Sequence, residues 1–489
     1  MRKAASVTLR STPVVLLAFS LFAPSVAEAG GFTVARWAGE HGEPTTDNPT
    51  AIYFNPAGLA LGTGWRVYAE GIFAWRTVKY DRPELAISNV LDPGDTGSGT
   101  PVDAMDTNSG EATLGNLIIN PFLGVATDFG VPNLGVGIAF FAPMGGQAKW
   151  DKNDKYADSG EYPGAGDGVQ RWSTIEGELR SLYLAVGGAY RLPGPRLSFG
   201  AGFNFIRSNV ETVRARNATG TDDLVTSTGI VLEGRSLIDV HGYAASVSAG
   251  VIWEPMEKMW VGASYQAQPG FGNNTQSGTL TNKFGAGGVE ESDVRLEQEL
   301  PDVTRIGFRY QPTTQVELRL SGDFQRWSVF ENQCFLDGSM PKDQTSCSLD
   351  DNGAQLPGSM GIVVNIPRRW KNTYGLRGGG SYWFTPDLEL NGGVAFDSSA
   401  VPDETIDVSL LDQNKLFAIA GVRWAAVPRT LVLGLTLNNV FYFKRTVAPR
   451  ERDADDNQIG FDPPSSVPDG AGTYKQNVFY ANVGLEYMF

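Results

Sequence analysis

The chain ends with Val478-Phe-Tyr-Ala-Asn-Val-Gly-Leu-Glu-Tyr-Met-Phe489, in which apolar residues occupy every second position counted back from Phe489. The six positions on this face are Phe489, Tyr487, Leu485, Val483, Ala481 and Phe479, while the intervening positions are mixed and polar. Because side chains alternate between the faces of a β-strand, one face suits lipid and the other a wet lumen. Aromatic residues stand at both ends of the apolar face, where the two membrane–water interfaces would lie. The pattern predicts a membrane-spanning strand of the bacterial outer-membrane type; the alternative is an edge strand of a soluble sandwich.

The N-terminus has the pattern of a signal peptide that is cleaved on export. A basic start precedes a short apolar core at residues 14–23, and Ala27-Glu-Ala29 offers a small-x-small cleavage site. We therefore expect residues 1–29 to be removed. The apolar core is too short for a helical span, and no later stretch offers about 20 consecutive apolar residues. Because lipid cannot satisfy open sheet edges, a membrane protein without spanning helices must be a closed barrel.

The composition agrees with a barrel and argues against nucleic acid as a partner. The net charge is −15, 59 residues are glycine and 11% are aromatic, which suits acidic external loops and aromatic girdles. No basic stripe is present. The hydrophobic fraction of 42% looks soluble, but only every second residue of a barrel strand faces lipid.

Fourteen strand candidates alternate with connections of two kinds. Short turns rich in Pro, Gly and Asp join the strands at one end, and long polar loops join them at the other. This is the outer-membrane pattern, with the long loops outside the cell. We predict an all-β fold, a 14-stranded antiparallel transmembrane β-barrel over residues 65–489. The predicted strands are 65–79, 116–128, 133–143, 179–191, 196–211, 236–254, 259–269, 301–311, 315–328, 370–384, 388–396, 415–425, 430–442 and 476–489.

Residues 30–64 precede the first strand and do not alternate. They contain two Asn-Pro turns and many apolar groups, as in Asn48-Pro-Thr-Ala-Ile-Tyr-Phe-Asn-Pro-Ala-Gly-Leu-Ala60. A free segment in the periplasm would expose these apolar groups to water. A barrel of this width is an open pore unless something fills its lumen. We expect residues 30–64 to form a plug, with Asn55, Pro56 and Ala57 as a preformed turn, because proline fixes its own backbone angle and restricts the preceding residue.

The two cysteines, Cys334 and Cys347, lie in one polar stretch. The periplasm and the cell surface are oxidising, so we predict that they form a disulfide. The alternative, a metal site, lacks a nearby histidine.

Four stretches of this chain resemble the FadL family of long-chain fatty-acid transporters and its hydrocarbon-uptake relatives such as TodX. They span nearly the whole mature chain in the right order, and they are Gly30-Gly31-Phe32, the Asn-Pro-Ala motif at residues 48–59, Leu300–Pro312 and Trp370–Tyr374. The resemblance implies a monomeric barrel with an N-terminal hatch, an apolar pocket beside the hatch that Phe32 reaches, and a kinked third strand that releases the ligand sideways. Here that strand contains Phe141, Pro143, Gly145 and Gly146. Proline cannot donate to the ladder and glycine weakens it; the alternative is a strand that simply ends at Pro143.

A ligand with a carboxylate would need a cation. By the resemblance, Arg207 falls where the fatty-acid transporters present a basic residue to the head group. The resemblance places the family's second basic residue near Ile366, which is not basic, but Arg368 and Arg369 follow it closely in the sequence. An arginine fork suits a carboxylate. The alternative for Arg207 is a rim residue that contacts lipopolysaccharide phosphate or loop acids, and a neutral hydrocarbon or aromatic ligand remains open.

Catalysis, cofactors and metals are not expected. The two histidines are His41 and His241, and neither a Gly-x-Ser-x-Gly elbow nor a nucleotide-binding loop is present. The acidic run at residues 453–457 lacks the glycine of a calcium loop, so a solvated loop is the simpler reading. The predicted function is uptake of a hydrophobic small molecule through a plugged barrel set among outer-membrane lipid and lipopolysaccharide. The alternatives are a general porin, which ion conductance would reveal, and a structural or adhesive barrel.

Overall fold

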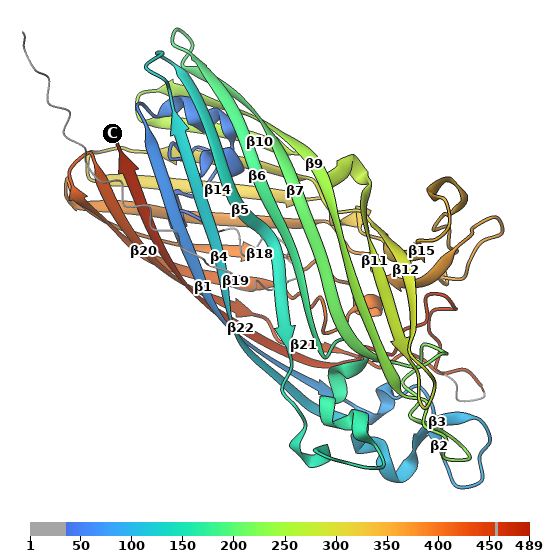
Figure 1. Cartoon of the computed structure of the whole chain (residues 1–489). Helices are drawn as coiled ribbons and strands as arrows, with labels where there is room; N and C mark the ends of the chain where they lie inside the picture. The colour runs from blue at the N-terminus through green and yellow to red at the C-terminus, as the bar shows by residue number, and fades with distance from the viewer. Residues whose placement is uncertain (1–35, 455–457) are drawn as a thin grey trace, which may run out of the picture.

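The computed structural model describes residues 36–454 and 458–489, and in them one antiparallel sheet closes on itself (Figure 1). The first strand, β1 (Arg66–Arg82), pairs with β4 (Gly110–Thr127) on one side and with the last strand, β22 (Gly472–Met488), on the other. Counting strands that are interrupted but continue in line as one, the described residues form the predicted 14-stranded barrel. The predicted signal peptide and Phe32 lie outside the described residues.

Five of the barrel strands are interrupted, and the pieces lie in line because each pair of pieces joins the same neighbours. The interrupted strands are β10 (Met259–Gln266) with β11 (Asn274–Lys283), β12 (Glu290–Gln298) with β13 (Val303–Tyr310), β14 (Val316–Gln325) with β15 (Asn332–Asp337), β16 (Ile362–Pro367) with β17 (Thr373–Thr385), and β20 (Leu431–Tyr442) with β21 (Arg445–Val447). The other strands are β5 (Leu134–Lys149), β6 (Glu176–Leu192), β7 (Leu197–Arg216), β9 (Gly234–Met256), β18 (Leu388–Asp397) and β19 (Lys415–Val427).

The remaining elements are short. A small sheet in the long loops contains β2 (Val90–Leu91), β3 (Ser98–Pro101) and β8 (Val225–Thr226). The segment before β1 contains η1 (Gly39–His41), α1 (Ala51–Phe54) and η2 (Pro56–Leu61). The other single turns are η3 (Glu84–Ala86), η4 (Val102–Thr107), η5 (Asp154–Tyr156), η6 (Pro163–Asp167), η7 (Val169–Trp172), η8 (Pro269–Gly272), η9 (Trp327–Val329), η10 (Lys342–Gln344) and η11 (Asp403–Thr405). None of the helices in the described ranges is long and apolar enough to cross a membrane.

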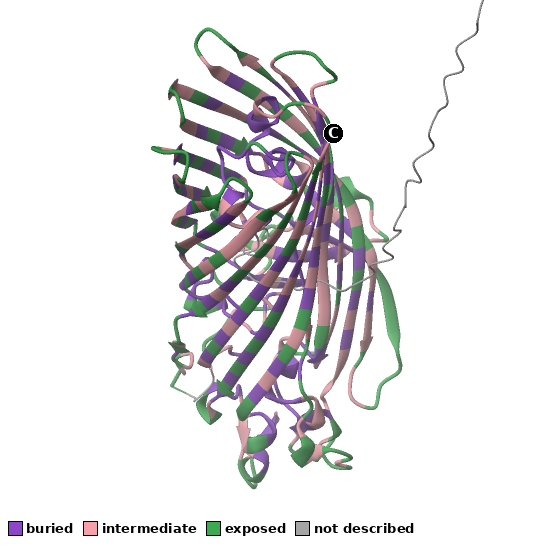
Figure 2. Cartoon of the chain, turned by 90° about the vertical axis from the view of Figure 1, so that its left-hand side faces the viewer, coloured by how far each residue is buried: buried purple, intermediate pink, exposed green. Residues whose placement is uncertain are grey.

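The predicted alternation of the last strand is confirmed. Phe489 and Leu485 are exposed on the outer surface, whereas Glu486 and Asn482 are buried inside. The outer apolar face begins and ends with aromatic pairs that join β1 to the C-terminal end of the chain: Trp65 stacks on Phe489 at 6.2 Å between ring centroids, and Trp75 meets Phe479 at 5.8 Å. Figure 2 shows the resulting alternation of buried and exposed residues along the strands.

The sequence-based strand list misses the parts of the wall nearest the long loops. We predicted residues 270–300 and 329–369 as loops, but they contain β11, β12, β15 and β16. In β11 and β12 the outward positions are polar, so the alternation with lipid-facing residues is lost. For example, β12 reads Glu-Glu-Ser-Asp-Val-Arg-Leu-Glu-Gln.

The predicted disulfide between Cys334 in β15 and Cys347 in the following loop is present. The two cysteines are 13 residues apart, so the bond closes a short loop against the wall strand. By the loop-entropy model, a closure of this size contributes about 3 kcal/mol.

We expect the double variant Cys334→Ser/Cys347→Ser to assemble as a barrel but to exchange amide hydrogens faster between β15 and β16, because the bond restrains this loop rather than the membrane-spanning wall. Hydrogen exchange measured by mass spectrometry tests this, and the heat-modifiable gel mobility of the folded barrel serves as the assembly control. Unchanged protection in residues 332–367 would show that the loop is held by its other contacts.

Candidate functional site

The described part of the segment before β1, residues 36–64, lies inside the barrel near the short-turn end (Figure 1) and is called the N-terminal segment below. Its backbone touches the inner wall at glycines. A Cβ atom on Gly200 would lie 2.3 Å from the Ala57 nitrogen, and one on Gly250 would lie 2.0 Å from the Asn55 side-chain oxygen. Any larger residue at these two wall positions would push the segment away.

The Asn55-Pro56-Ala57 tripeptide begins η2 and anchors it to the wall. The Asn55 side-chain oxygen accepts a hydrogen bond from the Ala57 N–H at 3.1 Å, which caps the helix, and Pro56 occupies the first helical position. The Asn55 amide nitrogen lies 2.8 Å from the Pro44 carbonyl oxygen and 3.1 and 3.3 Å from those of Val251 and Ala263. One buried amide therefore contacts the segment itself and two neighbouring wall strands, β9 and β10.

Charged groups hold the opposite side of the N-terminal segment against β14, β18 and β19. His41 Nε2 lies 2.6 Å from Glu389 Oε1, and His41 Nδ1 lies 3.0 Å from an Arg319 guanidinium nitrogen. A neutral imidazole satisfies both contacts, donating from Nε2 and accepting at Nδ1. Burial, together with Arg319 and Arg423, lowers the pKa of His41 to about 3, which favours this neutral form.

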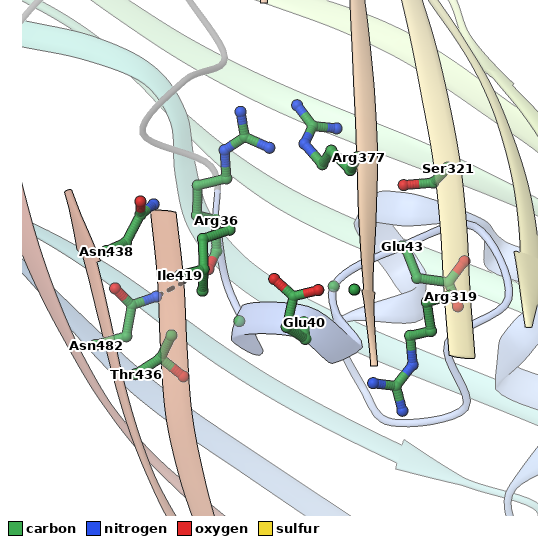
Figure 3. A pocket seen from close by; sticks show the side chains of 13 residues that line it. Arg36, Glu40, Glu43, Arg319, Ser321, Arg377, Ile419, Thr436, Asn438 and Asn482 are labelled. Carbon is green, nitrogen blue, oxygen red and sulfur yellow. Dashed lines mark hydrogen bonds between the residues drawn. The ribbon is translucent and has the colours of Figure 1, made fainter. Parts of the chain in front are cut away.

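A cavity of about 30 Å³, lined mainly by polar residues, lies between the segment and this wall. Figure 3 shows Arg36 and Glu40 of the segment facing the same space as Arg319 and Arg377 of the wall. Arg36 pairs with Asp397 at 2.8 Å, and burial raises the pKa of Glu40. This half of the lumen is charged and wet, so it is a poor path for an apolar molecule.

The other half of the lumen is apolar and aromatic. Trp37 of the N-terminal segment lies 5.0 Å from Tyr53, 5.2 Å from Phe122 of β4 and 5.2 Å from Phe141 of β5, measured between ring centroids. Phe141 also stacks on Tyr183 of β6 at 5.6 Å. These five residues are called the aromatic cluster.

The ladder between β4 and β5 ends directly beyond the aromatic cluster. The β4–β5 ladder runs from Thr127↔Val136 to Phe122↔Phe141, and beyond this pair β5 keeps its ladder with β6 alone. Asn116 Nδ2 bridges the two strands by donating to the Gln147 carbonyl oxygen at 2.8 Å. The Asp151 N–H donates to the Thr113 carbonyl oxygen at 3.0 Å. The stretch between the Phe122–Phe141 pair and this last bond is called the parted section.

The four residues predicted to form a lateral gate lie along the β5 side of the parted section. The register of β5 against β6 shifts between Phe141 and Met144, on either side of Pro143, which has no N–H to donate. Residues 141–146, which include Gly145 and Gly146, are all buried, so the alternation of faces stops here and the strand turns toward the lumen.

A second cavity of about 80 Å³ adjoins the parted section and opens to solvent at its mouth. Gly146 and Ala148 of β5 form one side of it, and apolar residues of the wall and loops form much of the rest. These apolar residues are Leu179, Val210, Ile238, Phe335, Ile366 and Leu410.

Two arginines line this cavity and differ in their partners. Arg368 is engaged, because its Nε donates to Gln333 at 2.8 Å and its Nη1 pairs with Asp407 at 2.7 Å. Although burial opposes it, Arg368 lowers the pKa of the Asp407 carboxyl, so this pair is charged at neutral pH. Arg214 is 7% exposed, and its Nε and Nη2 have no hydrogen-bond partner among the described residues. Arg214 is therefore the group that can receive an anion.

The structure separates the two arginines singled out in the sequence. Arg368 lines the cavity, but Arg207 lies on the outer surface of β7 between exposed positions, level with Tyr243 of β9, and does not line it. The reason is the period of two along the strand, which puts Phe203, Phe205 and Arg207 outside and Val210 inside. The sequence reasoning missed Arg214, which the same count from Val210 places on the inner face. No group of three or more His, Cys, Asp or Glu residues suited to a metal occurs in the described ranges.

We expect acidification to loosen the N-terminal segment. The pKa of His41 is about 3 in the folded protein and 6.5 unperturbed, so between these values the unfolded state binds more protons. The folded state therefore becomes less stable as the pH is lowered. The slope is at most about 1.4 kcal/mol per pH unit. The protection factors of the amide hydrogens in residues 36–64, which are corrected for the intrinsic pH dependence of exchange, should therefore fall between pH 7 and pH 4, and His41→Gln should flatten this fall.

The exposed His241 provides the control, because His241→Gln should keep the wild-type pH profile. Burial raises the pKa of Glu40 and of Glu43, which gives the opposite slope in every variant, so the difference between wild type and His41→Gln isolates the histidine. Identical pH profiles for these two proteins would rule out this role of His41.

The comparisons with known proteins agree with this geometry. A profile of the family described as outer membrane protein transport protein (OMPP1/FadL/TodX) matches residues 21–468. The long-chain fatty acid transport protein of Escherichia coli K12 is 23% identical over 378 residues, 71% of this chain and 76% of the relative. That of Salmonella typhi is 22% identical over 315 residues, 60% of this chain and 66% of the relative, just under two thirds of its length.

Two solved structures share the fold. A FadL homologue of Pseudomonas aeruginosa has a TM-score of 0.68 at 17% identity, covering 96% of this chain and 99% of the homologue. The toluene transporter TodX of P. putida has a TM-score of 0.59 at 14% identity, covering 90% and 94%. With the family profile matching most of its length, the chain belongs to the OMPP1/FadL/TodX family of outer membrane transport proteins.

Proposed function

We propose that this protein takes up hydrophobic molecules with an acidic head group and releases them sideways through the parted section between β4 and β5. The observation that carries the proposal is the end of the β4–β5 ladder at Phe122–Phe141, next to an apolar cavity. Burying a CH₂ group is worth about 0.8 kcal/mol, so a long alkyl chain loses much by crossing water. A sideways exit keeps such a chain in apolar surroundings from the cavity to the bilayer.

The two sides of the lumen support this direction of travel. The aromatic cluster lies on the side of the parted section, whereas the charged contacts of His41, Arg319 and Glu389 lie on the far side. The N-terminal segment fills the space between them, and we propose that residues 30–64 act as the hatch that blocks a straight path. A general porin would need an open lumen, so the packed segment disfavours that alternative. One chain forms the whole ring of strands, and we propose that the protein is a monomer.

Arg214 favours an acid over a neutral hydrocarbon. A buried guanidinium with two unpartnered nitrogens costs free energy unless an acceptor arrives, and a carboxylate can accept from both. A neutral ligand would leave the cost in place. One relative is named for fatty acid transport and another for toluene transport, so an acidic and a neutral ligand are the two choices. Arg214 favours the acidic ligand.

We expect Arg214→Gln to weaken binding of a long-chain fatty acid by about 10- to 100-fold, since hydrogen bonds to charged groups contribute about 1.5–3 kcal/mol. Binding of an alkane of the same length should change little. Titration of purified protein with both ligands measures the difference, and cellular uptake of the labelled acid should fall in parallel.

Arg207→Gln is the matched control, because it removes the same side chain from the outer face of the same strand. If Arg214→Gln and Arg207→Gln bound the acid equally well, the acidic head group would be wrong while sideways release could still hold. If wild-type cells took up neither ligand faster than a deletion strain, a structural or adhesive barrel would be favoured.

We expect a cross-link across the parted section to stop release. The Asn116 side chain donates to the Gln147 backbone carbonyl across the parted section, so a cysteine pair at these two positions puts one thiol on each facing edge, and we expect the pair to close under oxidation. Uptake should be blocked when the pair is oxidised and restored by a reductant, whereas ligand binding should persist. Transport of a labelled acid into membrane vesicles gives the readout.

A cysteine pair at Leu123 and Phe140 controls for the chemistry, because these residues already face each other in the intact ladder. Its oxidation should leave transport unchanged. Undiminished uptake through the oxidised Asn116–Gln147 pair would exclude the parted section as the exit.

A further inference from the structure

Three lysines lie side by side on the outer surface of the barrel. Lys79 of β1 and Lys475 of β22 face each other directly in the ladder, and both are exposed. Lys444, also exposed, lies at the join of β20 and β21. Because Arg445 pairs with Tyr474, the preceding Lys444 stands level with Lys475. These residues of three adjacent strands are called the lysine row, and Figure 1 shows β20, β22 and β1 next to one another.

The lysine row lies where the apolar surface ends on the side of the long loops. Along β1 the outward residues change from Trp75, which meets Phe479 of β22, to Thr77 and then Lys79. Four residues of strand correspond to about 13 Å along the chain. The lysines therefore stand just beyond the aromatic girdle, at the depth of the lipid head groups of the outer leaflet.

The protein balances only part of this charge. Like charges directly opposite each other in a ladder destabilise a sheet. Lys79 pairs with Glu111 at 2.9 Å, and both of these side chains are 56% exposed. Among the described residues, neither Lys475 nor Lys444 has a carboxylate within salt-bridge distance. The row therefore keeps an excess of positive charge that anions from outside the protein can neutralise.

We propose that the lysine row binds the phosphate groups of lipopolysaccharide. The row is on the cell-surface side, where the outer leaflet carries this phosphorylated glycolipid. Several lysines side by side suit a lipid with more than one phosphate, and ammonium groups at head-group depth attract anionic lipid. Below the row, Phe441 and Leu437 of β20 and Phe479 of β22 are exposed and give the acyl chains an apolar surface.

The test compares the triple variant Lys79→Gln/Lys444→Gln/Lys475→Gln with wild type, each as the full-length folded barrel. Native mass spectrometry of protein extracted from outer membranes in mild detergent should show at least a threefold loss of bound lipopolysaccharide in the variant. A second triple variant, Lys283→Gln/Lys342→Gln/Lys371→Gln, is called the loop-lysine variant; it removes the same charge from exposed positions in the long loops or at a strand end beside them, and it should retain the wild-type amount.

Thermal unfolding supplies an independent readout. In detergent free of lipid, the lysine-row variant should melt at the wild-type temperature or above it, because repulsion is removed. Added lipopolysaccharide should raise the melting temperature of wild type and of the loop-lysine variant but not that of the lysine-row variant.

Equal retention of lipopolysaccharide by both triple variants would overturn the proposal. An equal rise in melting temperature with phosphatidylglycerol would also overturn it, because the row would then recognise any anionic lipid. Neither result bears on uptake, since the lysine row is on the outer surface and does not contact the cavity or the parted section.

Discussion

Lipid offers no hydrogen-bond partners to the backbone, and this constraint governs every part of the barrel. It closes β1 onto β22 and makes a break in the wall costly unless the freed groups are met from within the protein. The parted section meets this condition. Residues 141–146 turn inward and are buried, Pro143 removes one donor, and Asn116 and Asp151 bridge the strands further along. An opening toward the bilayer is therefore compatible with a stable wall at this place.

The N-terminal segment has two unlike sides, and they fix its position. Buried ion pairs such as Arg36–Asp397 add little net stability, because desolvation offsets their attraction, but they penalise any other arrangement that leaves a charge unpaired. The aromatic contacts of Trp37 and Tyr53 supply the apolar burial on the other side. The charged contacts orient the segment, and the aromatic contacts press it against the strands that border the parted section.

Local patterns predicted the parts of this structure that depend on local periodicity. The alternation in the last strand, the turn at Asn55 and the bend at Pro143 each depend on neighbouring residues. All three occur in the structure at the positions that those residues indicate. The sequence could not place the cavity, because Arg214, Arg368 and Asp407 come from a strand and two loops that are far apart in the chain. Arg207 shows a different limit. Its prediction as a ligand residue rests on the resemblance alone, whereas the alternation of faces along β7 puts it on the outer surface.

The position of Trp37 relates ligand arrival to the exit. Its ring touches Phe122 and Phe141, the last pair before the ladder stops, so one side chain of the N-terminal segment covers the lower edge of the parted section. An alkyl chain that reaches this edge competes with Trp37 for the same aromatic surface. The segment continues from Trp37 to Arg36, whose ion pair with Asp397 lies on the charged side, so displacing the ring strains a contact on the far side of the lumen. A small shift of this end of the segment would uncover the proposed exit, whereas the hydrogen bonds of Asn55 to β9 and β10 would keep the rest of the segment in place.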